Sequence, residues 1–190
     1  MTFARTTNFV AATAIALTSA AGLAYAASEK NPMVGGAPMY ESKNIIENAV
    51  NSKDHETLVA AVKAAGLVDT LSGDGPFTVF APTDAAFDAL PAGTVETLLK
   101  PENKDQLTKI LTCHVVSADA LSGAIMKMVD DDKGAHPVKT VGGCTFTAMY
   151  DGDTIMLKDG QGNVANVTIA DVEQSNGVIH VIDKVLLPAS

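Results

Sequence analysis

The feature that most constrains the fold of this chain is a change in hydrophobic periodicity near its middle. From Ser42 to about residue 112, apart from a strand-like segment at 77–81, apolar residues recur every three or four positions, which places them on one face of a helix. Later apolar residues alternate or run together in short segments, which predicts strands. Because the helices come first and most strands last, the sequence predicts an α+β fold and not a parallel doubly wound sheet. The predicted strands are 77–81, 113–116, 137–141, 144–150, 154–158, 164–172 and 178–187.

Composition favours one packed domain and excludes two classes of partner. A chain of 190 residues is long enough for a single domain, and its 47% hydrophobic content allows a core to form. The 22 acidic residues outnumber the 13 Lys and Arg residues, which gives a net charge of −9. Such a charge argues against binding to nucleic acid or to an anionic membrane surface, because both need a basic face.

The first 26 residues have the pattern of a secretory signal peptide. Arg5 precedes an uncharged apolar stretch, residues 9–23, and the A-x-A cleavage pattern occupies residues 24–26. The alternative is a transmembrane anchor, but the stretch is shorter than the ~20 residues that a spanning helix needs. We therefore predict a signal peptide over 1–26 and a secreted or periplasmic protein.

The mature chain is expected to begin with a flexible N-terminal tail. Residues 27–41 contain two prolines and a glycine pair without any hydrophobic period, which is typical of a linker. The folded domain is expected over residues 42–189, because no repeat and no second boundary interrupts that range.

Two segments carry the strongest pattern in the chain. FTVFAPTDAAF, residues 77–87, is a predicted strand that continues into a helix capped by Thr83. NGVIHVIDKVLLP, residues 176–188, is a predicted closing strand. Both strands have apolar residues on both faces, so they are expected inside the sheet and not at its edges. We call these two segments the signature segments.

With His114-Val115-Val116 between them, the signature segments resemble those of the fasciclin domain family over residues 42–188. The resemblance implies a wedge of two packed β-sheets with surrounding helices. It also implies a role in extracellular adhesion or matrix binding without catalysis. One position departs from the family, because Cys113 stands where the family usually has Tyr.

Asp84 and His114 are candidate site residues. Asp84 lies in the first turn of a helix, where a carboxylate is stabilised, and a buried His114 would need a hydrogen-bond partner. We predict a hydrogen bond between them, or from each to nearby backbone, that joins the helix to the sheet. The alternative is that both residues contact a binding partner.

The two cysteines, Cys113 and Cys144, lie in predicted strands of an exported chain. An even number of cysteines in an oxidising compartment favours a disulfide between them. The alternative is two buried thiols that act as small apolar side chains.

The sequence lacks local signs of catalysis or metal binding. The histidines, at positions 55, 114, 136 and 180, do not pair at metal-binding spacing, and no G-x-S-x-G motif is present. Residues 159–163, DGQGN, lack the following Gly and Glu of a calcium loop and predict a turn. We therefore expect no catalytic residue, no metal and no cofactor.

These observations predict a secreted, non-enzymatic binding module whose partner is a protein or a surface carbohydrate. Its best candidate surface is residues 118–136, where a predicted amphipathic helix over 118–131 ends in Asp130, Asp131 and Asp132. Negative charge there would steer basic partners. The alternative is that this helix only covers the core.

A second hypothesis is a periplasmic carrier of an apolar small molecule. It would need an open pocket among Met126, Met128 and Phe146. A hydrolase is a third hypothesis, and the sequence offers no local support for it.

Overall fold

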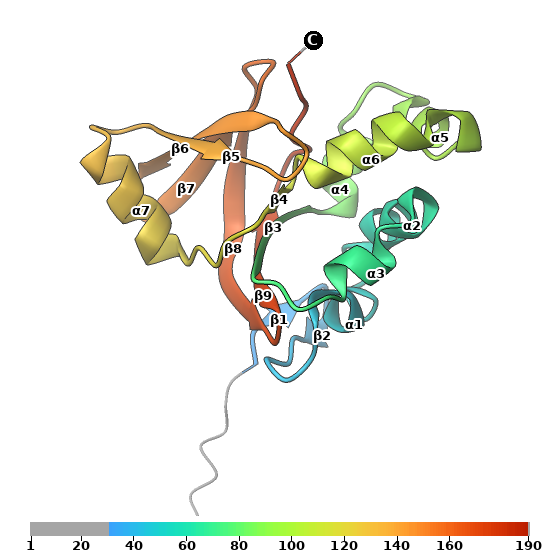
Figure 1. Ribbon diagram of the computed structural model, residues 1–190, viewed down its shortest axis with the longest axis horizontal. Coiled ribbons are helices and arrows are strands. Elements are labelled where there is room, and N and C mark those ends of the chain that lie inside the picture. The colour runs from blue at the N-terminus through green and yellow to red at the C-terminus, as the bar shows by residue number, and fades with distance from the viewer. Residues whose placement is uncertain (1–30, 190) are drawn as a thin grey trace, which may run out of the picture. The chain divides into compact units, whose positions relative to one another are not determined.

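The computed structural model describes residues 31–189, and the predicted signal peptide lies outside the described residues. Within 31–189, seven strands form one hydrogen-bonded sheet, here called the large sheet, in the order β4-β3-β9-β8-β7-β6-β5 (Figure 1). Adjacent strands are antiparallel except for β3 and β9, which are parallel. The strands are β3 (Phe77–Pro82), β4 (Val115–Val116), β5 (His136–Lys139), β6 (Thr145–Asp151), β7 (Thr154–Lys158), β8 (Val164–Gln174) and β9 (Gly177–Ile182).

Most helices come from the first half of the chain, as the periodicity predicts. In Figure 1, α1, α2, α3, α5 and α6 lie on one side of β3 and β9, and α7 lies on the other side near β6 and β7. This arrangement confirms the predicted α+β class. The helices are α1 (Ile45–Ala49), α2 (Glu56–Ala65), α3 (Val68–Leu71), α4 (Asp84–Asp88), α5 (Thr94–Leu98), the 3₁₀ turn η1 (Pro101–Asn103), α6 (Lys104–Thr112) and α7 (Ser122–Asp131).

The long strand β8 joins the two halves of the large sheet. It pairs with β7 over its first residues and with β9 from Val167 onward. Two register shifts, on either side of Ile169, interrupt the pairing with β9. Because β-bulges bend a strand and increase its twist, the sheet cannot continue flat at this point. The two sheets implied by the resemblance are therefore two halves of one sheet that share β8.

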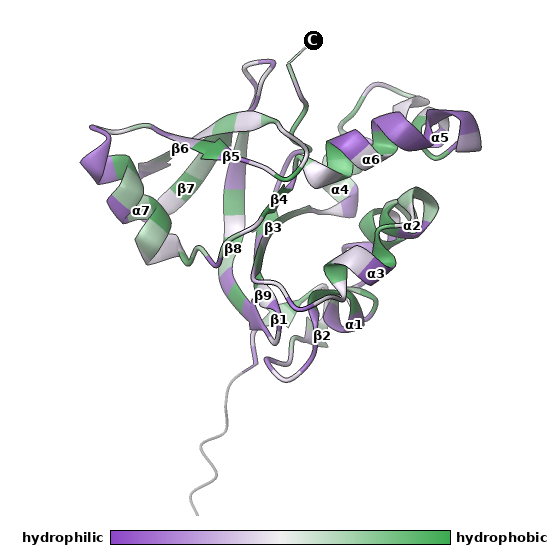
Figure 2. Cartoon of the chain, viewed as in Figure 1, coloured by the Kyte–Doolittle hydropathy of each residue, from purple (hydrophilic) through white to green (hydrophobic). Residues whose placement is uncertain are grey.

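Apolar side chains within 31–189 form two clusters, which lie on opposite faces of β3. Val79 and Ala81 belong to the first cluster, with the helices of the first half of the chain. Phe80 points the other way into the second cluster, where its ring meets that of Phe146 on β6 edge-to-face, with centroids 5.3 Å apart. The second cluster thus fills the space between the two halves of the large sheet. Figure 2 shows hydrophobic and hydrophilic residues alternating along β8, as expected for a strand with one face toward an apolar cluster.

The prediction of a flexible tail over 27–41 is wrong for the described part of that range. β1 (Met33–Val34) and β2 (Ala37–Pro38) form an antiparallel hairpin, and the compact unit begins at Asn31 instead of residue 42. Val34 and Met39 are buried in the first cluster. Strands of two residues are too short to show a hydrophobic period, so the sequence pattern did not reveal them.

Helix α7 begins later than the predicted residue 118. Thr78 on β3 donates its hydroxyl to the Ala118 carbonyl at 2.6 Å and accepts from the Ala120 amide at 2.9 Å. These backbone groups are bonded to a side chain, so they do not enter a helical ladder. Residues 117–121 therefore form a loop that crosses the end of β3.

Strand β9 ends at Ile182 and not at the predicted residue 187. The Leu186 amide donates to His114 Nε2 at 2.9 Å, and the Leu187 amide donates to an Asp159 carboxylate oxygen at 3.0 Å. Both amides bond side chains from other parts of the chain instead of a neighbouring strand. The apolar run after β9 is therefore a buried irregular segment.

A disulfide joins Cys113, just after α6, to Cys144, just before β6, with Cα atoms 5.4 Å apart. Beside it, the Val141 amide donates to the Val115 carbonyl at 2.8 Å. A Cβ atom on Gly142 would lie 2.8 Å from the Cys113 nitrogen, so only glycine permits this close approach. The disulfide and this hydrogen bond fasten the two edges of the large sheet, β4 and β5, to each other at one end.

We expect the disulfide to contribute substantially to stability. Its loop of 31 residues predicts a loss of roughly 3–4 kcal/mol in the free energy of unfolding for the Cys113→Ser/Cys144→Ser variant, from the entropy of the unfolded chain. Urea denaturation of oxidised protein, reduced protein and the double variant measures this loss, and the last two should agree. Two free thiols in the denatured, unreduced protein would contradict the prediction.

Candidate functional site

The signature segments meet at the centre of the large sheet. β3 and β9 pair in parallel over their whole length, from Phe77 opposite Gly177 to Pro82 opposite Ile182. β4 flanks β3 and β8 flanks β9, so both strands are internal, as the apolar faces predict. These segments therefore specify the core and present little surface to a partner.

Asp84 caps a neighbouring helix. Its carboxylate accepts hydrogen bonds from the amides of Thr57 at 2.8 Å and Glu56 at 3.3 Å, which are the first residues of α2. The Asp84 amide in turn donates to the Asp54 carbonyl, just before α2, at 2.8 Å. The half-buried Asp84 carboxylate thus bonds two amides that have no partner within α2, and its negative charge lies at the positive end of that helix. Thr83 caps α4, the helix that contains Asp84.

His114 is buried and bonded to backbone on both sides of its ring. Its Nδ1 lies 2.8 Å from the Ile110 carbonyl, and its Nε2 accepts from the Leu186 amide at 2.9 Å. This pattern requires a neutral ring with the proton on Nδ1. Burial lowers the pKa of His114 to about 4, although the bond to the Ile110 carbonyl opposes that shift.

The structure does not join Asp84 and His114 to each other. Each side chain bonds to nearby backbone, which is the second form of the predicted contact. His114 is 2% exposed, so it cannot touch a partner directly. Asp84 remains half-buried and its carboxylate is engaged by α2. Both residues therefore act by holding helices and the C-terminal segment against the large sheet.

A second buried histidine holds the loop before α7. His180 on β9 places Nε2 2.8 Å from the Ala120 carbonyl, and Nδ1 accepts from the Asp171 amide at 3.3 Å. Burial lowers the pKa of His180. Asp171, in the bulge of β8 with φ of 56°, accepts from the Ser122 amide at 2.6 Å and so caps α7. The loop is thus fixed to three strands, because Thr78 on β3 also bonds it.

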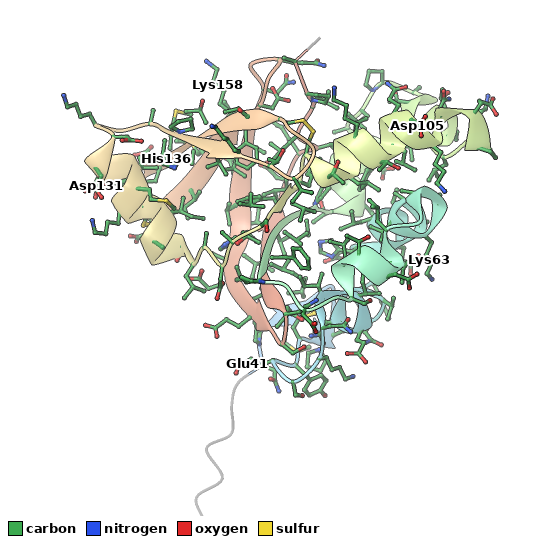
Figure 3. All side chains as sticks on the ribbon, in the orientation of Figure 1. Glu41, Lys63, Asp105, Asp131, His136 and Lys158 are labelled. Atoms are coloured by element: carbon green, nitrogen blue, oxygen red, sulfur yellow. A yellow bond between two sulfur atoms is a disulfide. The ribbon has the colours of Figure 1, made fainter. Side chains whose placement is uncertain are left out.

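The acidic end of α7 is exposed and internally paired. Tyr150 donates its hydroxyl to Asp130 at 2.5 Å, Lys127 lies 2.8 Å from Asp131, and His136 Nδ1 lies 2.7 Å from Asp132. Figure 3 shows Asp131 and His136 at this corner of the molecule, away from Asp105 on α6. The three aspartates therefore present a surface whose charge is partly offset by its neighbours.

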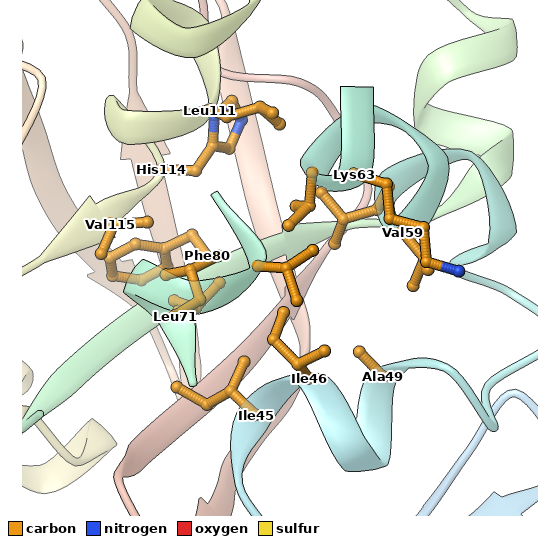
Figure 4. Close-up of a pocket in the computed structure, with 14 residues that line it drawn as sticks. Ile45, Ile46, Ala49, Val59, Lys63, Leu71, Phe80, Leu111, His114 and Val115 are labelled. Atoms are coloured by element: carbon orange, nitrogen blue, oxygen red, sulfur yellow. The ribbon is translucent and has the colours of Figure 1, made fainter. Parts of the chain in front are cut away.

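An apolar crevice separates α1 and α2 from the large sheet. Figure 4 shows the residues that line it, which include Ile45 and Ile46 on α1, Val59 on α2, and Phe80 and His114. Its volume is about 40 Å³, which is room for about one water molecule. Side-chain packing therefore closes this crevice to a larger ligand in the structure described.

A larger cavity of about 290 Å³ lies between α7 and the edge strands β4 and β5. The sequence predicted that a carrier would need a pocket among Met126, Met128 and Phe146. Met128 lines this cavity, but Phe146 is buried in the second cluster behind it and Met126 packs against the same cluster. The pocket is instead completed by residues of β3 and β5.

Side chains that could perform chemistry are dispersed. Within 31–189, no group of three or more His, Cys, Asp or Glu residues is placed to hold a metal ion, and no helix there is long and apolar enough to cross a membrane. His55 lies 2.8 Å from the Ser52 hydroxyl, but burial lowers its pKa. Asp159 accepts from the amides of Gln161 and Asn163, so its loop is a turn, as predicted.

The sequence pattern did not predict the residues that cap the start of α7 or border the larger cavity. Asp171 offered a signal, because Asp is disfavoured inside strands and its presence there suggests a bulge. His136 and Lys139, which border the larger cavity, offered none. Their position depends on the approach of β5 to β4, which the local sequence does not encode.

Comparison with known proteins places these features in a family. A model of the fasciclin domain matches residues 53–188, a range that contains both signature segments. The Synechocystis protein sll1483 is 45% identical over 191 residues, which cover 98% of each chain. The cell surface glycolipoprotein MPB83 of Mycobacterium bovis is 37% identical over 145 residues, which cover 74% of this chain and 58% of the relative.

A solved structure shows the same fold. The FAS1 domain pair from the insect cell adhesion molecule Fasciclin I matches with a TM-score of 0.66 and 20% sequence identity. The match covers 76% of this chain and 51% of that one, so this chain spans about half of the domain pair. At this identity the likeness supports the fold alone.

Removing the Asp84 carboxylate should destabilise the protein. We expect Asp84→Ala to lower the free energy of unfolding by about 1–2 kcal/mol, because α2 loses its cap, and Asp84→Asn to cost less because Asn can still accept. Chemical denaturation followed by circular dichroism measures both. Asp88→Ala, an exposed change on the same helix, is the control, and equal stability of Asp84→Ala and Asp88→Ala would refute the cap.

Stability should fall in mild acid because of His114. The unfolded chain protonates this ring near pH 6.5 and the folded protein near pH 4, so the free energy of unfolding decreases as the pH drops between these values. The full difference is about 3 kcal/mol. We expect His114→Gln to reduce the slope of this part of the stability profile without removing it, because burial also lowers the pKa values of His55 and His180, whereas His136→Gln should preserve the slope. Parallel profiles for the wild type and His114→Gln would disprove the assignment.

Proposed function

This chain belongs to the fasciclin domain family, and we propose that it is an exported binding protein without catalytic activity. In this proposal it acts at the cell surface or in the envelope by contacting a protein or a surface carbohydrate. The observation that carries the proposal is the family match over 53–188, together with a relative named as a cell surface glycolipoprotein.

The role of the buried polar residues supports a binding module over an enzyme. Asp84 caps α2, and His114 and His180 bond to backbone with lowered pKa values. A general acid or base must reach a substrate and titrate near the working pH. These side chains are occupied by structural bonds, so they support stability and not proton transfer.

We place the partner contact at the acidic end of α7. Asp130, Asp131 and Asp132 are exposed there, at the end of a helix whose first residue is bonded to Asp171 and whose preceding loop is bonded to His180. An exposed group of negative charges can steer a basic partner toward this end of the helix and speed its association. The buried His114 is excluded from this contact.

Attachment of living cells tests the proposal. We expect a strain that lacks the protein to attach less to its surface, host or neighbouring cell, and we expect the wild-type gene to restore attachment. A gene carrying Asp130→Asn, Asp131→Asn and Asp132→Asn should restore it incompletely, most clearly at low salt, because steering by charge is screened by ions.

The matched control carries Asp69→Asn, Asp74→Asn and Asp105→Asn, three exposed acids outside α7 that give the same change in net charge. It should restore attachment fully. Normal attachment of the strain without the protein would reject the adhesion function. Full restoration by the α7 variant would instead reject only the surface assigned to it.

A further inference from the structure

We propose that the cavity between α7 and the edge strands β4 and β5, here called the edge cavity, binds a single-chain amphiphile with an anionic head, of the class of medium-chain carboxylates. The edge cavity is bordered by Phe80, Val116, Ile125, Met128, Val138 and Lys139, among others. This proposal goes beyond adhesion, because it assigns a small-molecule site to a different part of the domain.

The fold itself creates the edge cavity. The bent large sheet brings its two edges, β4 and β5, toward each other, and the Cys113–Cys144 disulfide with the bond from Val141 to Val115 closes them at one end. Away from that end no further bond between β4 and β5 is present in the described residues, and α7 covers the gap. The resulting space is like the mouth of a partly closed barrel, a common location for small ligands.

The interior of the edge cavity suits a hydrocarbon chain. Phe80, Ile125 and Ala148 are buried side chains that line it. Thr78 also lines it, but its hydroxyl already donates to the Ala118 carbonyl and accepts from the Ala120 amide. The interior therefore offers apolar surface and no free polar side chain, so burial of an apolar chain would be favourable there.

The rim of the edge cavity favours an anionic head. Among the described residues that line it, the ionisable ones are His136 and Lys139, both bases, although the whole chain has a net charge of −9. Lys139 is exposed and has no ion pair in the described part of the chain. His136 shares its Nδ1 with Asp132, which leaves Lys139 as the main contact for a carboxylate.

The volume limits the occupant to one chain. A methylene group is similar in size to a water molecule, whose share of the liquid is ~30 Å³. A cavity of about 290 Å³ therefore holds about ten such groups, which matches one chain of medium length. Decanoate, with ten carbons and one carboxylate, matches both the volume and the rim.

Titration of the purified protein with decanoate, below its micelle concentration, tests the proposal. We expect saturable one-to-one binding by calorimetry, weaker binding of decyltrimethylammonium, and amide chemical-shift changes concentrated on α7, β5 and β6 in nuclear magnetic resonance spectra. Shift changes centred on α1 and α2, or equal affinity for the cationic probe, would overturn the site or the head-group assignment. Absence of saturable binding would overturn the proposal as a whole.

Two pairs of variants separate the edge cavity from the rest of the surface. Val138→Trp should fill the cavity and abolish decanoate binding, whereas Val50→Trp places the same ring at an exposed position outside it. Lys139→Met should weaken binding up to about fivefold, as expected for an exposed ion pair, and Lys158→Met on β7 should not. Circular dichroism verifies folding of each variant. Unchanged binding by folded Val138→Trp would refute the site. If that variant does not fold, the location of the amide chemical-shift changes in the wild-type protein tests the site instead.

Discussion

The parallel pairing of β3 with β9 is the contact on which the rest of this structure depends. It brings together segments separated by about one hundred residues. Both faces of the pair are buried, one in each of the two apolar clusters. A Cβ atom on Gly177 would lie 1.9 Å from the Phe77 carbonyl oxygen, so only glycine allows the pair to begin there. Asn176 extends the contact, because its side chain bonds the amide of Ile45 and the carbonyl of Leu71.

Buried polar side chains then attach the helices and loops to this pair. His114, His180, Asp84 and Asp171 each bond to a backbone amide or carbonyl at a helix end or in a loop. A buried polar backbone group without a partner costs free energy, so each such bond selects one position for its loop. Histidine and aspartate often perform catalysis, but in this fold they fix the positions of loops and helices, and so determine which surfaces stay exposed. Those surfaces are the acidic end of α7 and the edge cavity.

Much of the fold could be predicted from local pattern. The hydrophobic period gave the α+β class, both signature segments were expected inside the sheet, and Thr83 was expected to cap the helix after β3. The first helical residue of α7, the end of β9 and the hairpin at β1 could not be predicted. Their backbone groups bond or pack against residues distant in sequence, and no local period records such contacts.

The sequence by itself determined the class of domain, because apolar periodicity and turn residues act within a few positions of one another. It also indicated the acidic run at the end of α7 and the pair of cysteines. Only the tertiary structure decided what those residues do. It placed the Asp84 carboxylate at the first amides of α2, buried the His114 ring below the surface, and opened a cavity bordered by Lys139. The physical reason is that the bend of β8 brings the two edges of the large sheet together, and that approach depends on the whole chain.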